Sequence, residues 1–333
     1  MDTAPAAVRP PQAAPTERPP VRAWLQPILI ALVVVSAFIS CYVGLARAPQ
    51  PHRLPVAVVG SHLSAQIQQA LGDSIDVHSA PSVAAADQAL RHRDVAGVLV
   101  PEGAGDLYLE VAGANGPSTT GAVKSLISAY GHGAGSTVTV KDVVPLTQYD
   151  SRGFAAFYVA FGVTLSGFAL AQSILGLSQL LHLRHRFTVM AGFAVIAGVV
   201  AATLAGPVLG AVPAPFPLLA VTLALLAAAA AFTTKLLGTY FGPVGVPLAT
   251  LLLLTIGNAT SGATIGEDLL PGVAHSVSGI LPPGAAVRAI TNLSYFDGAH
   301  TLVPLLCLAA WAVCSALLVW GRSTYRATQS RQA

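Results

Sequence analysis

Six apolar runs without Asp, Glu, Lys or Arg constrain this sequence more than any other feature. They cover residues 24–45, 154–177, 188–212, 216–234, 238–257 and 301–320. About 20 apolar residues in a helix cross a bilayer core of roughly 30 Å, since each residue adds 1.5 Å. Only 9% of the 333 residues are charged, against roughly 25% in soluble domains. We therefore predict a polytopic α-helical membrane protein with six spans.

The first run follows a proline-rich stretch, residues 1–22, which predicts a disordered cytoplasmic tail. The alternative interpretation of 23–46 is a signal peptide, because "ARA" at 46–48 resembles a cleavage site. Pro49 would follow that cut directly, and the run is longer than an ordinary signal core. Both observations favour an uncleaved first span.

Residues 47–152 have the pattern of a soluble domain. Strand-like apolar runs at 54–60, 74–80, 95–101, 106–113 and 136–146 alternate with helical patterns at 61–72, 82–94 and 118–131. Alternating strands and helices within about 100 residues predict a compact α/β domain. This domain would be inserted between the first and second spans.

Apolar runs return after Arg152, with spans two to five in 153–257 and the sixth in 300–321. Between the fourth and fifth runs the break is "TKLLGTYFGP" at 234–243, where a hairpin dipping into the membrane is the alternative. The segment 258–299 is too polar and proline-broken to cross, and too apolar for an ordinary exposed loop.

Basic residues predict the orientation. With the N-terminus in the cytoplasm, Arg288 is the one basic residue of the short outer loops, as the positive-inside rule asks. The inner segments then hold Arg9, Arg18, Arg22, Arg184, Arg186, Lys235, Arg322, Arg326 and Arg331. The protein is thus predicted to lie in a bacterial plasma membrane, with an extracellular α/β domain and with both termini, including 322–333, in the cytoplasm.

The sequence predicts no catalytic, cofactor-binding or metal-binding residue. "GPSTTGAVKS" at 116–125 has glycines at P-loop spacing, but Ala122 and Val123 precede the lysine. His182 and His185 lack a nearby carboxylate, and the three cysteines, all in apolar runs, suit packing. Scattered basic residues exclude nucleic acid as a partner.

The spans themselves carry few chemical signals. Their middles hold no ionisable residue, which argues against an ion channel or a proton-coupled carrier. Asn258 and Asn292 are interpreted as turn formers. One helix face permits close packing against a neighbour, because small residues recur every four positions at Ala194, Gly198, Ala202 and Gly206.

The order of parts, together with three stretches, resembles the ABC-2-type transporter permease superfamily, in its YhgE/Pip-related (phage infection protein-like) branch. The stretches are "LPVAVVG" (54–60), "GNATSGATIGEDLLPG" (257–272) and "LPPGAAVRAITNLSYFDG" (281–298). Ala263 stands where that branch commonly has a second glycine.

The resemblance implies a permease subunit of an exporter for an apolar or amphiphilic substrate. A separate ABC ATPase subunit would hydrolyse ATP, so this chain would not be an enzyme, and the permease would act as a homodimer or as a pair. The ATPase would contact the loop 178–187, with Leu183, Arg184, His185 and Arg186 as candidates.

The resemblance also implies an outer gate in the segment 258–299, with Pro282, Pro283, Gly284, Tyr295 and Phe296 as candidates. Pro282 and Pro283 would start a helix with a broken apolar face of Leu281, Val287, Ile290, Leu293 and Phe296. The alternative is an interfacial helix without a role in transport.

A second function stays open. The family has an amphipathic helix before its first span, whereas residues 1–22 are broken by prolines. This departure favours a membrane-anchored receptor, binding or scaffold protein whose extracellular domain recognises an outside partner.

Overall fold

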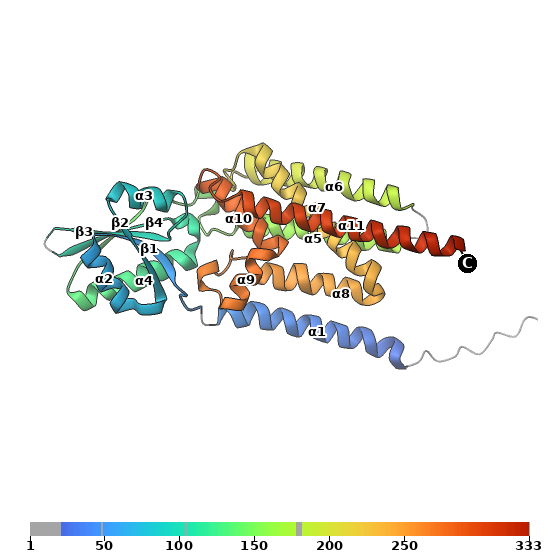
Figure 1. Ribbon diagram of the computed structural model, residues 1–333, viewed down its shortest axis with the longest axis horizontal. Helices are drawn as coiled ribbons and strands as arrows, with labels where there is room; N and C mark the ends of the chain where they lie inside the picture. Colours follow the sequence, from blue (N-terminus) through green and yellow to red (C-terminus); the bar gives the residue numbers. More distant parts are fainter. Residues whose placement is uncertain (1–20, 48, 104, 178–181, 333) are drawn as a thin grey trace, which may run out of the picture.

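The chain forms an α/β domain and a bundle of long helices, placed end to end along the longest axis (Figure 1). This computed structural model describes residues 21–47, 49–103, 105–177 and 182–332. The predicted tail 1–22 lies outside the described residues, except for Val21 and Arg22, which begin the first helix. Helix α1 (Val21–Ala46) leads into the α/β domain, and the chain returns to the bundle at α5 (Ala155–Gly176).

A five-stranded mixed sheet in the order β2-β1-β3-β4-β5 is the base of the domain. Strand β1 runs parallel to β2 and β3, β3 pairs antiparallel with β4, and β4 runs parallel to β5. The five predicted strands and three predicted helices of this region are present, because each apolar run ends in glycine or polar turn residues. The strands are β1 (Leu54–Val59), β2 (Ile75–Ala80), β3 (Gly97–Glu102), β4 (Asp106–Val111) and β5 (Val138–Asp142).

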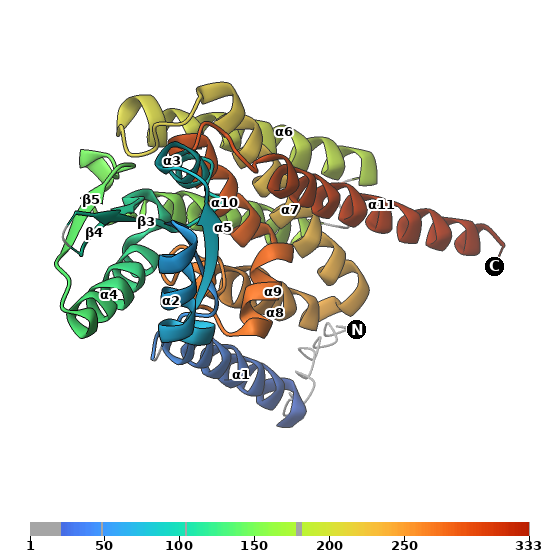
Figure 2. The ribbon, with the colours of Figure 1, turned by 60° about the vertical axis from the view of Figure 1, so that its left-hand side comes forward.

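Helices cover both faces of the sheet (Figure 2). Side chains alternate across the pleat, so Leu54 and Val56 of β1 pack with Ile67 on one face. Ala57 points to the opposite face and packs with Leu90. Helices α2 and α4 lie on the first face and α3 on the second, with the bounds α2 (Ser61–Leu71), α3 (Val83–Arg91) and α4 (Pro117–Ala134).

The domain core takes residues from outside 47–152. Ile265, Leu269 and Leu270 are at most 7% exposed and pack into the cluster of the first face. Phe296 is 1% exposed and packs on the second face. Residues 47–152 therefore do not supply the whole core of the domain, because the segment before the last long helix folds back onto it.

Five helical stretches of the described residues are long and apolar enough to cross a membrane. The predicted runs 216–234 and 238–257 both lie in the fourth, which has 42 residues, whereas one crossing needs about 17–25. The stretches are Leu25–Ala46, Ala155–Gly176, Leu183–Val208, Phe216–Gly257 and Leu302–Tyr325. Besides α1 and α5, these stretches contain α6 (Leu183–Thr203), the π-helical η4 (Leu204–Val208), α7 (Phe216–Phe241), η5 (Gly242–Val244), α8 (Gly245–Ala249), the π-helical η6 (Thr250–Gly257) and α11 (Leu302–Gln332).

The fourth stretch turns back later than the sequence predicted. Helix α7 continues through 234–241, and the chain turns at Gly242, whose φ is 58°. Pro243 sets this point, because proline lacks an N–H and disfavours a helical conformation in the residue before it. Lys235, predicted in an inner connection, instead lies within α7 and is 3% exposed.

Helix α7 is the centre of the bundle, and small residues bring α5 and α6 close to it. A Cβ added at Gly198 of α6 would lie 2.6 Å from the carbonyl oxygen of Ala220, and one at Gly167 of α5 would lie 2.6 Å from that of Ala227. Ala194 of the predicted small-residue face is also buried. The predicted close packing of this face is confirmed.

Segment 258–299 folds at the end of the bundle that faces the α/β domain (Figure 2). It forms the 3-10 turn η7 (Glu267–Leu269), α9 (Gly272–Ile280) and α10 (Pro282–Tyr295). Helix α10 begins at Pro282, as predicted, and packs against α5, α7 and α11. The five residues of its predicted apolar face are at most 6% exposed, whereas an interfacial helix would leave one face uncovered.

Candidate functional site

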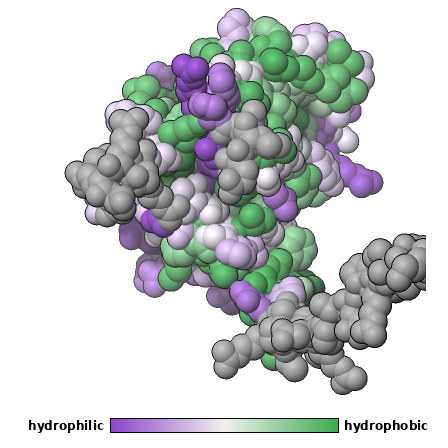
Figure 3. All heavy atoms as spheres, turned by 90° about the vertical axis from the view of Figure 1, so that its right-hand side faces the viewer, coloured by the Kyte–Doolittle hydropathy of each residue, from purple (hydrophilic) through white to green (hydrophobic). Residues whose placement is uncertain are grey.

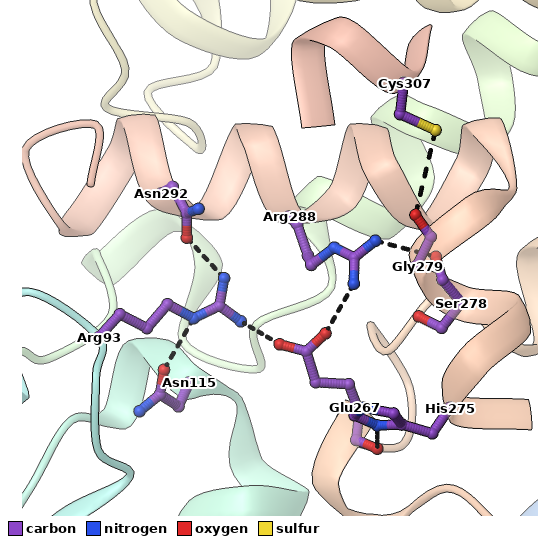
Figure 4. Close-up of polar contacts among 9 residues, drawn as sticks. All are labelled: Arg93, Asn115, Glu267, His275, Ser278, Gly279, Arg288, Asn292 and Cys307. Carbon is purple, nitrogen blue, oxygen red and sulfur yellow. Dashed lines mark hydrogen bonds and ion pairs between the residues drawn. The ribbon is translucent and has the colours of Figure 1, made fainter. Parts of the chain in front are cut away.

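Five polar side chains join the α/β domain to the segment before the last long helix (Figure 4). Arg93 follows α3, and Asn115 ends the 3-10 turn η2 (Gly113–Asn115). Glu267 begins η7, and Arg288 and Asn292 lie four residues apart on one face of α10. We call Arg93, Asn115, Glu267, Arg288 and Asn292 the interdomain cluster.

Glu267 forms ion pairs with both arginines of the interdomain cluster and accepts a hydrogen bond from Arg288. Its Oε1 lies 3.5 Å from Nη2 of Arg93, and its Oε2 lies 3.1 Å from Nη1 of Arg288. Arg288 also donates through Nη2 to the carbonyl oxygen of Ser278 at 3.0 Å. One carboxylate therefore ties the α/β domain, η7, α9 and α10 together.

Arg93 uses every edge of its guanidinium in this interface. Its Nε donates to Oδ1 of Asn115 at 3.3 Å, its Nη1 to Oδ1 of Asn292, and its Nη2 faces Glu267. The guanidinium plane stands 5.6 Å from the ring centroid of Phe296, within the range of a cation–π contact. A lysine could not make these directional contacts, because it is a point charge without a planar fork.

The backbone at Arg93 adopts a left-handed conformation, with φ of 62°. Glycine or asparagine commonly takes this conformation after a helix, because a Cβ disfavours it by roughly 1–2 kcal/mol. Next in the chain, Asp94 accepts from Nε2 of His300 at 2.8 Å. The turn after α3 thus presents two successive side chains to the segment around α10.

The interdomain cluster is largely withdrawn from solvent. The side chains of Arg93, Arg288 and Glu267 are 19%, 21% and 24% exposed. At this burial the desolvation of the charges offsets much of their attraction, so the cluster adds little net stability. Loss of one partner, however, leaves the others uncompensated, so the cluster specifies how the domain sits on α10.

A cavity of about 110 Å³ lies beside the cluster, between the domain and the helices. Arg93, Glu267 and Arg288 line it together with Asp268 and Ser261. Ser261 Oγ is buried without a hydrogen-bond partner among the described residues. Burial, reinforced by the neighbouring Glu267, raises the pKa of Asp268 to about 6. The cavity is roomy and polar enough to hold several water molecules.

The predicted gate residues frame α10. Pro282, Pro283 and Gly284 form its buried first turn, and a Cβ at Gly284 would collide with the carbonyl oxygen of Ser278. At the other end, Tyr295 Oη accepts from the backbone N–H of Thr147 at 3.4 Å. All five candidates, including Phe296, therefore belong to one structural unit.

The predicted ATPase-contact residues lie at the opposite end of the bundle, remote from the α/β domain (Figure 1). Leu183, Arg184, His185 and Arg186 form the first turn of α6, not a loop. The helix starts before the predicted apolar run at 188, because leucine and arginine are good helix formers and a charge does not end a helix. Arg184 and His185 are exposed, Arg186 is half-buried, and residues 178–181 lie outside the described residues.

Comparisons with known proteins add no relative: no family profile matches the chain, and no curated protein or solved structure is significantly similar to it.

Arg93, Asn115 and Glu267 were not predicted as site residues, and Asn292 was interpreted as a turn former. That interpretation was wrong for Asn292, which lies within α10 and is buried. Asn258 is also buried, but it caps the end of η6, and its carbonyl oxygen accepts from the N–H of Ser261 in the turn that follows. One signal was available for part of the cluster. Glu267 and Arg288 are charged residues in a segment predicted at membrane depth, where a charge needs a partner.

Proposed function

We propose that this chain is the membrane permease subunit of an ABC-2-type exporter for an apolar or amphiphilic substrate. The observation that carries the proposal is the place of α10, a short buried helix between the α/β domain and the long helices α5, α7 and α11. A helix with this placement can open or close the end of the bundle without crossing a membrane. The stretches around it are strongly apolar and carry their few charged residues toward the end remote from α10, which suits an apolar substrate.

The proposed topology has six crossings, because the turn at Gly242 divides the 42-residue stretch Phe216–Gly257 into two. The start of α1 and the end of α11 lie at the same end of the molecule, remote from the α/β domain (Figure 1). Basic residues concentrate at that end, whereas Arg288 near the domain is paired with Glu267. We therefore place the domain outside the cell and both termini in the cytoplasm of a bacterium.

In the proposed mechanism, the interdomain cluster makes the α/β domain and α10 move as one body. Glu267 and Arg93 hold the domain to α10, and α10 contacts α7 at the centre of the bundle. A shift of the long helices, driven by ATP hydrolysis in a separate subunit, would move α10 and open an outward path. The exposed Arg184 and His185 at the start of α6 are the proposed contact for that ATPase.

The first test is purification of the tagged full chain in mild detergent with any ATPase that accompanies it, followed by reconstitution. Arg184→Glu should reduce permease-stimulated ATP hydrolysis at least fivefold. The matched control is Lys141→Glu, which reverses an exposed charge on β5 at the other end of the molecule. Equal stimulation by both variants, or reproducible purification without any ATPase, would refute the exporter proposal.

A second test addresses the topology. In a variant without the three native cysteines, Lys141→Cys should react with an impermeant maleimide in intact cells. Phe241→Cys, at the exposed turn after α7, should react only after lysis. Labelling of Phe241→Cys in intact cells would exclude the six-crossing arrangement.

One observation favours the second candidate function, a membrane-anchored receptor. Strand β5 is an edge of the sheet, and four of its five residues are exposed. Such an edge can accept an extended peptide as an additional strand. In that case the full chain, displayed on cells, should capture an external protein in a manner lost on Val140→Pro, since proline removes a backbone donor at the open edge of β5. Unchanged capture by that variant would exclude this edge as the binding surface.

A further inference from the structure

The end of the bundle remote from the α/β domain gathers basic residues that have no acidic partner among the described residues. Lys235 of α7 is 3% exposed and lies within electrostatic range of Arg186 of α6. Nearby on α11, the guanidinium of Arg322 stacks 4.1 Å from the ring centroid of Tyr240. Figure 3 views this end and shows hydrophilic residues among hydrophobic surfaces.

The three helices hold these residues at neighbouring levels, with Arg322, which meets Tyr240, about 8 Å further toward the helix ends than Lys235. Helices α7 and α11 run in the same direction, since Thr233 and Ser315 hydrogen-bond at 3.1 Å and Tyr240 and Arg322 meet seven residues further along both. From α6, Phe187 contacts Phe232 with ring centroids 5.2 Å apart. These contacts bring Arg186, which precedes Phe187, to the level of Lys235.

Few acidic residues of the chain are close in sequence to these cations. The chain has no Asp or Glu between residues 151 and 266, and none after residue 297. The Nε atoms of Arg186 and Arg322 are buried and have no hydrogen-bond partner among the described residues. Buried charges and buried N–H donors are costly unless they are paired. An anion from outside the chain would satisfy both requirements.

The depth of the residues favours a lipid as the source of this anion. Lys235 lies six residues before the end of α7, and Arg186 three residues after the start of α6, or about 9 Å and about 5 Å along their helices. Both are inside stretches apolar enough to span a membrane. A soluble protein partner would not reach a nearly buried amine there, whereas lipid phosphates lie at this boundary. Exposed apolar side chains such as Val189 and Leu318 flank the site and suit acyl chains.

We propose that the ends of α6, α7 and α11 remote from the α/β domain bind the phosphate group of an anionic phospholipid, with Arg186, Lys235 and Arg322 as its cationic partners. Arg186 and Arg322 supply directional N–H donors to the phosphate oxygens. Lys235 adds a charge from behind them. The site is independent of the interdomain cluster and of the ATPase that the exporter proposal requires.

The test uses the full chain, delipidated in neutral detergent, with phosphatidylglycerol, phosphatidylcholine or inorganic phosphate added at equal phosphate concentration. Phosphatidylglycerol should raise the apparent Tm by about 4 °C or more at saturation, and the other two should not. Lys235→Met should abolish at least half of this shift. It should also raise the Tm of the delipidated protein, because an apolar side chain of similar length replaces an uncompensated charge.

Arg186→Gln should reduce the number of retained phosphatidylglycerol molecules in native mass spectra, and Arg91→Gln, on the exposed face of α3, is its matched control. An equal response to inorganic phosphate would replace the lipid by a free-phosphate site. If neither phosphatidylglycerol nor inorganic phosphate raises the apparent Tm, the proposal is overturned. If phosphatidylglycerol stabilises the protein only after deletion of residues 2–20, which contain Asp2 and Glu17, these carboxylates are the counter-charges in the full chain and the proposal is overturned.

Discussion

Substitution of Glu267 by glutamine tests whether the interdomain cluster determines how the α/β domain sits on α10. The substitution keeps the shape of the side chain but removes the charge that Arg93 and Arg288 share, at 3.5 and 3.1 Å. Both arginines would remain in place, about one-fifth exposed, without their common carboxylate.

The expected cost follows from this burial. Breaking a fully buried charge pair typically costs 3–5 kcal/mol, and an exposed pair is worth 0–1 kcal/mol. Because the three side chains are mostly buried, we expect Glu267→Gln to lower the free energy of unfolding by about 3 kcal/mol. The matched control is Asp87→Asn, which breaks the Arg91–Asp87 pair one turn apart on α3, where Arg91 is 55% exposed. That control should cost about 0.4 kcal/mol.

Unfolding would be measured by denaturant titration of the full chain in micelles, with limited proteolysis reporting separation of the domain from α10. A double-mutant cycle of Glu267→Gln with Arg93→Met should give a coupling energy above about 1 kcal/mol. The reasoning is refuted if Glu267→Gln costs no more than Asp87→Asn, or if the cycle shows no coupling.

Three further perturbations have definite outcomes. Asp268 has a pKa of about 6 in the folded protein against 3.8 ordinarily, so the folded state binds its proton more tightly. Its contribution is greatest below pH 3.8 and is lost as the pH rises through 6; the free energy of unfolding at pH 5 should exceed that at pH 7 by about 1.3 kcal/mol. Asp268→Asn should remove this difference in denaturant titrations, and a variant that keeps it would exclude Asp268 as the source. Gly198→Ala places a Cβ 2.6 Å from the carbonyl oxygen of Ala220 and should cost about 1–3 kcal/mol. Gly192→Ala on the same helix meets no atom within 4 Å and should be neutral or stabilising; similar apparent Tm values for the two variants would contradict the close α6–α7 contact. Gly284→Ala would collide with the carbonyl oxygen of Ser278 and should lower the apparent Tm by several degrees, whereas Gly279→Ala, with its nearest contact at 3.8 Å, should not. Equal effects would show that the turn between α9 and α10 tolerates a side chain.

The elements of the fold follow from local patterns, and these were predictable. The strands of the α/β domain are apolar runs closed by turn residues, and α1, α5 and α11 are apolar runs of membrane-crossing length. The start of α10 was also visible, since Pro282 and Pro283 can begin a helix but cannot continue one. Each of these features depends on residues close together in the sequence.

The features that sequence reasoning missed depend on distant partners. Arg93 and Glu267 are 174 positions apart, and no local pattern connects them. Lys235 looked like the end of a span because a charge interrupts the apolar run, yet a charge does not break a helix, and α7 continues to Phe241. Asn292 looked like a turn former by propensity, but tertiary contacts outweigh propensity where a buried side chain accepts from an arginine.

The composition of the domain core has a consequence for biosynthesis. The core requires Ile265, Leu269 and Leu270, which emerge from the ribosome about 120 residues after the domain's own last residues. At 5–20 residues per second, that interval lasts roughly 6–24 s. During this time three further stretches that are long and apolar enough to cross a membrane are synthesised, while the sheet stands with part of one apolar face uncovered. The domain therefore reaches its final form late in translation, and a nascent chain stalled before residue 265 should be sensitive to proteases that the finished protein resists.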